Sequence, residues 1–159
     1  MSSKIKQNVL MIALLIALFA AVGWILGQNN YFVMDDYTTI YIRGIIENPT
    51  QSFSFLPQAR YNDRPVGTIF VGILYYLFGM NAQGYHFVFV LVHLCNVYLV
   101  WNITKKLLCR FSISNASLTA FIAAAIFGAY PQSIMAPQWV SAVFDLLCCF
   151  FVLCSLYYF

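Results

Sequence analysis

Long apolar runs alternate with short polar segments along this chain. The first uninterrupted apolar run covers residues 9–26, and as a helix it would measure roughly 27 Å, close to the roughly 30 Å hydrocarbon core of a bilayer. Lys4 and Lys6 precede this run. Because no small-x-small cleavage site follows it, the pattern predicts an uncleaved signal anchor over residues 9–27, with its N-terminus in the cytoplasm.

Three further apolar runs predict membrane-spanning helices over residues 84–104, 116–130 and 138–159. Residues 131–137 carry two prolines and lie between the last two spans. We expect them to form a short turn outside the membrane. Trp139 would then lie at the outer end of the last span, where aromatic side chains anchor helices at the interface.

The apolar run at residues 65–79 decides the topology. Its fifteen residues make roughly 22 Å of helix, which is short for a crossing. If it crossed, the basic cluster at residues 105–110 would lie outside the cell; if it lies along the surface, that cluster is cytoplasmic, like Lys4 and Lys6. The positive-inside rule favours the surface arrangement. The chain is therefore predicted to have about four transmembrane helices, plus one or two juxtamembrane surface helices in an outer loop at residues 28–80.

Composition supports this class of fold. The chain is 62% hydrophobic and 8% charged, whereas soluble domains carry about 25% charged residues. The net charge of +3 comes mainly from basic residues near the predicted membrane borders. It therefore reports on the membrane topology and does not point to a nucleic-acid partner. We expect an all-α polytopic membrane protein with residues 1–159 in a single membrane domain and the lipid bilayer as its solvent.

An acidic pair, Asp35-Asp36, lies in the polar segment 27–64, which holds four of the five acidic residues. A short interfacial helix is expected over residues 36–47. Adjacent side chains diverge on a helix or strand, so the two carboxylates would have different roles: one accepts a proton from a nucleophile, and the other accepts a hydrogen bond or holds a metal. A solvated acidic loop explains the pair equally well.

Two arginines, Arg60 and Arg64, are the candidates for binding a phosphate, because a guanidinium can bind two oxygens at once. Pro65 suits the first turn of a helix, which would put Arg64 at its N-cap. The alternative is an arginine that holds a lipid head group or pairs with Asp63.

Four polar residues inside the predicted spans are candidates for hydrogen bonds between helices or for substrate contact. His86, His93 and Asn96 share one helix face; hydrogen bonds between helices are expected for His93 and Asn96, whereas His86, near the outer end, is a candidate for substrate contact. Asp145 is the one carboxylate inside a span, about two turns from Trp139. A carboxylate there is either a substrate contact or a structural partner for a neighbouring helix.

Common catalytic motifs are absent from the sequence: it has no Gly-rich phosphate loop, no Ser-His-Asp order, no HExxH motif and no Cys/His metal cluster. No cofactor is firmly implied, and a divalent metal stays open. A phosphate-bearing substrate would have to be bound by arginines and helix ends, which favours a lipid-linked donor over a nucleotide sugar.

Several short motifs follow one another in a specific order: Asp-Asp at 35–36, Arg-Pro-Val-Gly at 64–67, Tyr-His at 85–86, His-Leu-Cys-Asn at 93–96 and Asp-Leu-Leu at 145–147. In this order they resemble the N-terminal portion of GT-C-fold glycosyltransferases, the superfamily of protein O-mannosyltransferases and of the aminoarabinose transferase of lipid A. The resemblance implies a polyprenyl phosphate sugar as donor, Asp35 or Asp36 as catalytic base, and Arg64 as a contact for the donor phosphate.

The resemblance leads us to expect a membrane glycosyltransferase, or its N-terminal fragment, that transfers a sugar to an acceptor on the outer face of the plasma or inner membrane. Family members are several hundred residues long, so we expect this chain to be truncated relative to a full-length enzyme. The alternative is a non-catalytic membrane interaction or lipid-handling subunit, or an inactive truncated product.

Overall fold

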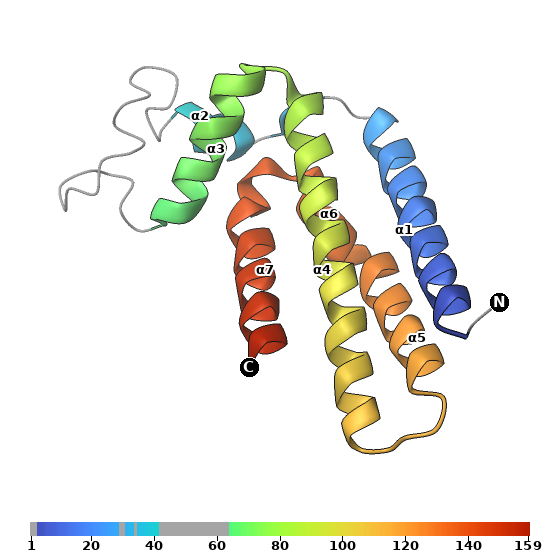
Figure 1. Ribbon diagram of the computed structural model, residues 1–159. Helices are drawn as coiled ribbons and strands as arrows, with labels where there is room; N and C mark the ends of the chain where they lie inside the picture. Colours follow the sequence, from blue (N-terminus) through green and yellow to red (C-terminus); the bar gives the residue numbers. More distant parts are fainter. Residues whose placement is uncertain (1–2, 29–30, 34, 42–63) are drawn as a thin grey trace.

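The computed structural model describes residues 3–28, 31–33, 35–41 and 64–159, and within them the chain is all-α (Figure 1). The described helices are α1 (Ser3–Gln28), α2 (Asp35–Tyr41), α3 (Pro65–Phe78), α4 (Ala82–Arg110), α5 (Ala116–Ala129), α6 (Pro131–Gln138), the 3-10 helix η2 (Val140–Ala142) and α7 (Val143–Tyr158).

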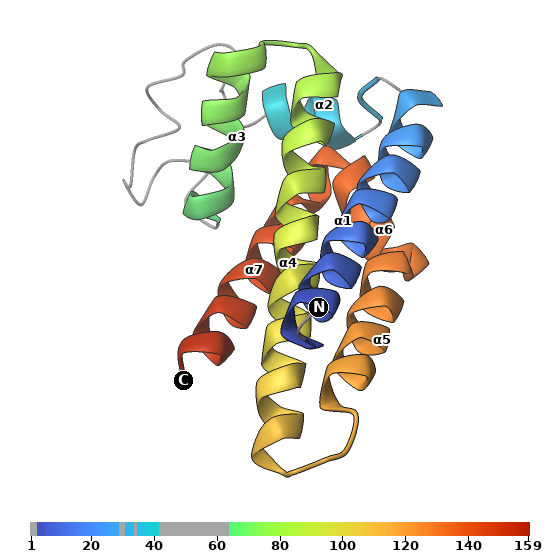
Figure 2. The same ribbon diagram turned by 45° about the vertical axis from the view of Figure 1, so that its right-hand side comes forward.

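Helix α4 is the central element. It contacts α1, α3, α5, α6 and α7, and the long axes of α1, α4, α5 and α7 run along the same general direction (Figures 1 and 2). The end of α1, the start of α4 and the short helices α2 and α3 lie at one end of this bundle; we call it the α2–α3 end. The loop between α4 and α5 lies at the opposite end.

Local sequence signals set the bounds of α3. Pro65 occupies the first turn and Arg64 the N-cap, as the sequence predicts. Gly79 ends the helix with a φ of 56°, a left-handed conformation that glycine adopts without steric cost. Asn81 then caps α4, because its side chain accepts a hydrogen bond of 3.1 Å from the backbone N–H of Gln83. These two signals turn the chain sharply from α3 into α4.

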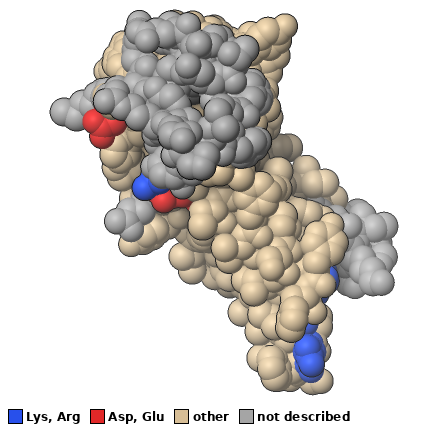
Figure 3. Space-filling view, turned by 90° about the vertical axis from the view of Figure 1, so that its left-hand side faces the viewer, with Lys and Arg blue, Asp and Glu red and all other residues tan. Residues whose placement is uncertain are grey.

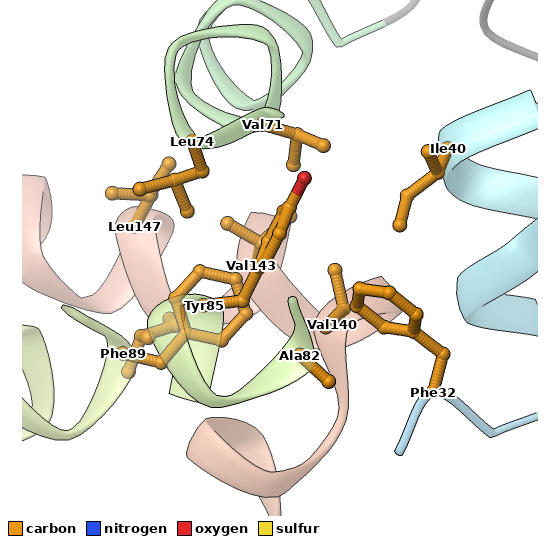
Figure 4. Close-up of a cluster of buried hydrophobic side chains, with 11 residues drawn as sticks. Phe32, Ile40, Val71, Leu74, Ala82, Tyr85, Phe89, Val140, Val143 and Leu147 are labelled. Atoms are coloured by element: carbon orange, nitrogen blue, oxygen red, sulfur yellow. The ribbon is translucent and has the colours of Figure 1, made fainter. Parts of the chain in front are cut away.

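A first core lies at the α2–α3 end of the bundle (Figure 4). Tyr85 and Phe89 of α4 are completely buried there. The Tyr85 hydroxyl donates a hydrogen bond of 2.9 Å to the Gly79 carbonyl oxygen, so its polar end is satisfied while its ring packs edge-on against Phe32, with 5.3 Å between the centroids. The other members are Ala82, which is also in α4, and residues from α2, α3, η2 and α7: Ile40, Val71, Leu74, Val140, Val143, Leu146 and Leu147.

A second core joins α1, α4 and α5. On α5 the buried positions are Ala120, Ala124 and Gly128, four residues apart and therefore on one face. Small residues at this spacing let helix backbones approach closely. The approach is tight at Gly128, where an added Cβ would lie 2.6 Å from a methyl group of Leu18.

The outer surface of the bundle is apolar. Exposed side chains include Ile16 on α1, Leu91 on α4, Ile126 on α5 and Val152 on α7. Among the described residues, two helical stretches are long and apolar enough to cross a membrane, Ala82–Arg110 and Val140–Tyr158, and three shorter apolar helices accompany them. The membrane placement of the individual segments stays a prediction.

The structure corrects the sequence interpretation at residues 131–145. The expected turn at 131–137 is the helix α6, because Pro131 fits a first helical turn, where its missing N–H is not needed. Trp139 is extended and η2 follows, so α7 begins only at Val143. Asp145 is consequently the third residue of α7 and exposed, and it lies within the stretch Val140–Tyr158 that is long and apolar enough to cross a membrane. Of the expected helix at 36–47, α2 covers the part up to Tyr41; residues 42–47 lie outside the described residues.

Candidate functional site

The carboxylate of Asp36 is buried and bonded to backbone. Its side chain is 0% exposed. One oxygen accepts a hydrogen bond of 3.0 Å from the N–H of Val33, just before α2. The other accepts one of 2.9 Å from the N–H of Ser141 in η2. Asp36 therefore fastens α2 to the segment that leads into α7.

A second hydrogen bond supports this junction. The hydroxyls of Thr39 and Ser141 lie 2.7 Å apart, so two successive turns of α2 are tied to the same residue of η2. The neighbouring Asp35 lies in the first turn of α2 and is exposed. The acidic pair is thus divided, as expected from the divergence of adjacent side chains: Asp36 is engaged in structure, and Asp35 presents its carboxylate at the surface.

Arg64 lies where α3 meets α7. Its guanidinium carbon is 5.0 Å from the centroid of the Phe144 ring, within the range of a cation–π contact. Next to it is a pocket of about 230 Å³ between α3 and α7, which we call the Arg64 groove. Its walls are residues 64–67 together with Phe144, Leu147, Cys148 and Phe151. Arg64 is the charged residue of this lining, so the groove combines one cation with an apolar trough.

The α2 and α3 helices dock on the same short stretch of chain. Asp36 of α2 accepts a hydrogen bond from the backbone N–H of Ser141. Gly67 of α3 packs closely against Phe144, because a Cβ added at Gly67 would overlap the Phe144 ring. Residues 141–144 therefore bring Asp35 and Arg64 to one end of the bundle. Figure 3 shows acidic surface and a basic patch toward this end, and further basic surface at the far end.

The polar residues of α4 hold neighbouring helices. His86 is buried, and its Nδ1 lies 3.0 Å from the Pro137 carbonyl oxygen at the end of α6. His93 Nε2 lies 3.2 Å from the carbonyl oxygen of Gly128, and the Asn96 amide donates to that of Leu146 at 3.3 Å. The bonds expected for His93 and Asn96 are confirmed. His86 likewise bonds to a neighbouring helix through Nδ1, and its contact with a substrate stays a prediction.

Asp145 borders a different pocket. This pocket measures about 240 Å³ and lies among α4, α5, α6 and α7, with His93 and Asn96 also in its wall. Arg60 lies outside the described residues. Among the residues that the structure describes, no three His, Cys, Asp or Glu side chains gather as a metal site would require.

Ser141 and Phe144 are the site residues that the sequence analysis missed. Ser141 binds Asp36 through its backbone N–H, a group that every residue except proline carries, and its hydroxyl pairs with Thr39 of α2 only through a long-range contact. Phe144 is one of fifteen phenylalanines and gains its role only from the contact with α3.

Comparison with known proteins gives no assignment. The chain matches no protein-family model, no curated protein and no solved structure. The function must therefore be inferred from the residues and geometry described above.

Proposed function

We propose that this chain acts, alone or as part of a longer protein, as a membrane glycosyltransferase of the GT-C type. It moves a sugar from a polyprenyl phosphate carrier to an acceptor on the outer face of the plasma or inner membrane. The N-terminus of α1 lies in the cytoplasm, and the α2–α3 end faces outward.

One observation carries this proposal: α2 and α3 dock on residues 141–144, which brings an exposed carboxylate and an arginine-headed apolar groove to the same end of the bundle. A lipid phosphate requires both a cation for its phosphate and an apolar surface for its chain. The guanidinium of Arg64 binds phosphate oxygens, and the side chains of Leu147 and Phe151 accommodate the first carbons of the prenyl chain.

Asp35 supplies the base in this scheme. Its carboxylate takes the proton from the acceptor hydroxyl as the oxygen forms a bond to the anomeric carbon of the sugar. The bond from that carbon to the phosphate oxygen breaks, and polyprenyl phosphate leaves. Arg64 stabilises the negative charge that grows on the leaving phosphate. Asp36 is a positioning residue, because it fixes α2 without facing the substrate.

The test is a transfer assay with the full chain, in the longest natural form that contains it, reconstituted in vesicles with radiolabelled polyprenyl phosphate sugars. Asp35→Asn removes the base while keeping the side-chain shape, so we expect the rate to fall roughly 10²–10⁴-fold. Thr38→Ala changes an exposed residue one turn further along α2 and is expected to leave the rate unchanged. Full activity of Asp35→Asn would rule out this assignment of the base.

A lipid-handling subunit without transferase activity is the second candidate, because the Arg64 groove would suit that function as well. Measuring the binding of farnesyl phosphate separates the two. Both functions require Arg64→Gln to weaken binding, but only the transferase requires a rate that depends on Asp35.

A further inference from the structure

A further pocket lies between the last turns of α4 and α7, away from the α2–α3 end of the bundle. The two helices are packed against each other, and the C-terminus lies beside the second half of α4 (Figures 1 and 2). The pocket measures about 270 Å³, and we call it the Arg110 pocket. Its walls are residues 103, 106, 107 and 110 of α4 and residues 156–159.

Two cations of α4 line this pocket. Lys106 and Arg110 are four residues apart, so they lie on the same side of the helix. The side-chain carboxylates that the structure describes are on α2 and in the first turn of α7, and none of them neutralises this pair. The face shown in Figure 3 accordingly has basic surface at this end. The Arg110 pocket therefore favours an anion.

Tyr157 holds one of the two cations in place. The Lys106 ammonium donates a hydrogen bond of 3.1 Å to the Tyr157 carbonyl oxygen and lies 3.6 Å from the centroid of the Tyr157 ring. The last carbonyls of a helix carry partial negative charge, which this ammonium offsets. An ammonium has three hydrogens to donate, so its bond to Tyr157 leaves two for an acceptor from outside the chain. The guanidinium of Arg110 lies one turn further along α4 and can bind two oxygens of the same anion.

Apolar side chains continue from the pocket along α7. Leu156 lines the pocket, and Val152 lies one turn before it on the same face of the helix. Both are more than half exposed, at 57% and 53%. A ligand with an anionic head and a long apolar chain would cover this strip, whereas a free anion would leave it bare.

The length of α4 carries the pocket to the level of lipid head groups. Its 29 residues make roughly 43 Å of helix, more than the roughly 30 Å hydrocarbon core of a bilayer. Ala82–Arg110 and Val140–Tyr158 are the two described stretches that are long and apolar enough to cross a membrane. When α4 crosses, its last turns extend past the hydrocarbon to the lipid phosphates. Basic pockets between membrane helices bind anionic head groups at this level.

We propose that the Arg110 pocket binds one anionic phospholipid. Its phosphate lies between Lys106 and Arg110, and an acyl chain runs along Leu156 and Val152. This lipid is bound as a structural partner away from the Arg64 groove, so the site does not depend on the proposed transferase activity.

Native mass spectrometry of the full chain tests the proposal. The protein is purified in a non-ionic detergent and titrated with phosphatidylglycerol or with phosphatidylcholine of the same acyl chains. Each bound lipid adds a resolved mass, so the occupancy gives the affinity for the first lipid. Glycerol 3-phosphate and hexaglutamate are added as competitors, because both carry negative charge without an acyl chain.

We expect phosphatidylglycerol to bind more tightly than phosphatidylcholine, whose choline cancels the phosphate charge. Arg110→Gln should weaken phosphatidylglycerol binding roughly five-fold, the effect of about 1 kcal/mol for one cation near a membrane surface. Arg110 is exposed, so the fold should persist, which circular dichroism verifies. Arg110→Lys keeps the charge and should keep the preference for the anionic lipid.

Lys105→Gln is the matched control. It removes the same charge from the same end of α4, but Lys105 lies on the Trp101 ring and is not part of the pocket lining. We expect this variant to bind phosphatidylglycerol with nearly the affinity of the unmodified chain.

Equal affinity for the two lipids would overturn the proposal. Equal losses for Arg110→Gln and Lys105→Gln would also overturn it, because the general charge of the helix end would then attract the lipid. Displacement by glycerol 3-phosphate would identify a soluble phosphate as the ligand, and displacement by hexaglutamate would identify an acidic peptide; either result rules out the lipid. A lipid preference that depends on Arg110 supports the site whatever the transfer assay shows, so the two proposals fail independently.

Discussion

At the residue scale, the side chain of Asp36 connects two segments that are more than a hundred residues apart in the sequence. Both of its oxygens accept backbone N–H groups, from Val33 and from Ser141, and the side chain is fully buried. Hydrogen bonds to a charged group are stronger than those between neutral groups, because the charge reinforces the attraction. Removing this carboxylate also leaves two donors without their acceptor.

We predict that Asp36→Ala lowers the free energy of unfolding by roughly 1.5–3 kcal/mol, the range for a hydrogen bond to a charged group. Unfolding by titration with SDS in mixed micelles, followed by circular dichroism, measures the change. Asp35→Ala is the matched control: Asp35 is exposed, so its removal should change stability by no more than about 0.5 kcal/mol. Equal losses for both variants would contradict the structural role of Asp36.

The sequence indicates that these two carboxylates differ, but it does not indicate which is buried. That assignment depends on the N–H of Ser141, a long-range contact without a local signal. The same limit applies to His86. Its place near the predicted outer end of a span suggested contact with a substrate, whereas the structure shows that it is buried and lies within hydrogen-bond distance of the Pro137 carbonyl oxygen at the end of α6.

At the scale of elements, α3 packs against α7 through a glycine. Gly67 is buried, and a Cβ at this position would overlap the Phe144 ring. The same ring lies under the Arg64 guanidinium. The absence of a side chain at Gly67 therefore lets α3 approach α7 and keeps the Arg64 groove in shape.

We predict that Gly67→Ala destabilises the protein by roughly 1–3 kcal/mol, the usual cost of overpacking a core. It should also weaken the binding of farnesyl phosphate, since Phe144 must move. Tyr76→Ala is the control on the same helix, because Tyr76 is 88% exposed and its loss removes little packing. A Gly67→Ala variant with unchanged stability and binding would show that α3 does not depend on this contact.

The positions of the long helices were largely predictable from the sequence. The short helices α6 and η2 between α5 and α7 were not. The apolar runs predict where α1, α4, α5 and α7 lie, because each buries one face and exposes apolar side chains on the other. The helix α6 was missed since Pro131 and Pro137 usually indicate a turn. Yet Pro131 begins a helix, where its missing N–H is not needed, and Pro137 is the last residue but one, so the helix ends one residue after it.

At the scale of the whole molecule, the described acidic residues lie toward the α2–α3 end together with Arg64, whereas the basic residues of α4 lie at the opposite end. The described carboxylates are on α2 and in the first turn of α7, whereas Lys105, Lys106 and Arg110 lie in the last turns of α4 (Figure 3). The lysines pack on aromatic rings: the Lys106 ammonium lies 3.6 Å from the Tyr157 ring centroid, and that of Lys105 lies 5.0 Å from the Trp101 ring. Lysines at a membrane border commonly lay their apolar stems on such surfaces.

This division of charge predicts the orientation in the membrane. Basic residues at span ends stay in the cytoplasm, so the loop between α4 and α5 should be cytoplasmic, and the turn between α3 and α4 should face outward. We test this with single cysteines in a variant whose five native cysteines are replaced by alanine or serine. The positions are Asn81→Cys in the α3–α4 turn and Ser114→Cys in the α4–α5 loop, both exposed.

A membrane-impermeant maleimide added to intact cells should label Asn81→Cys and leave Ser114→Cys unlabelled until the membrane is opened. The two positions flank α4, whose 29 residues make roughly 43 Å of helix at 1.5 Å per residue, more than the roughly 30 Å core of a bilayer. A helix of this length and hydropathy that crosses the membrane must put its ends on opposite sides. Labelling of both positions from outside would mean that α4 does not cross. Labelling of Ser114→Cys alone would reverse the orientation, and would place Asp35 and the Arg64 groove on the cytoplasmic side.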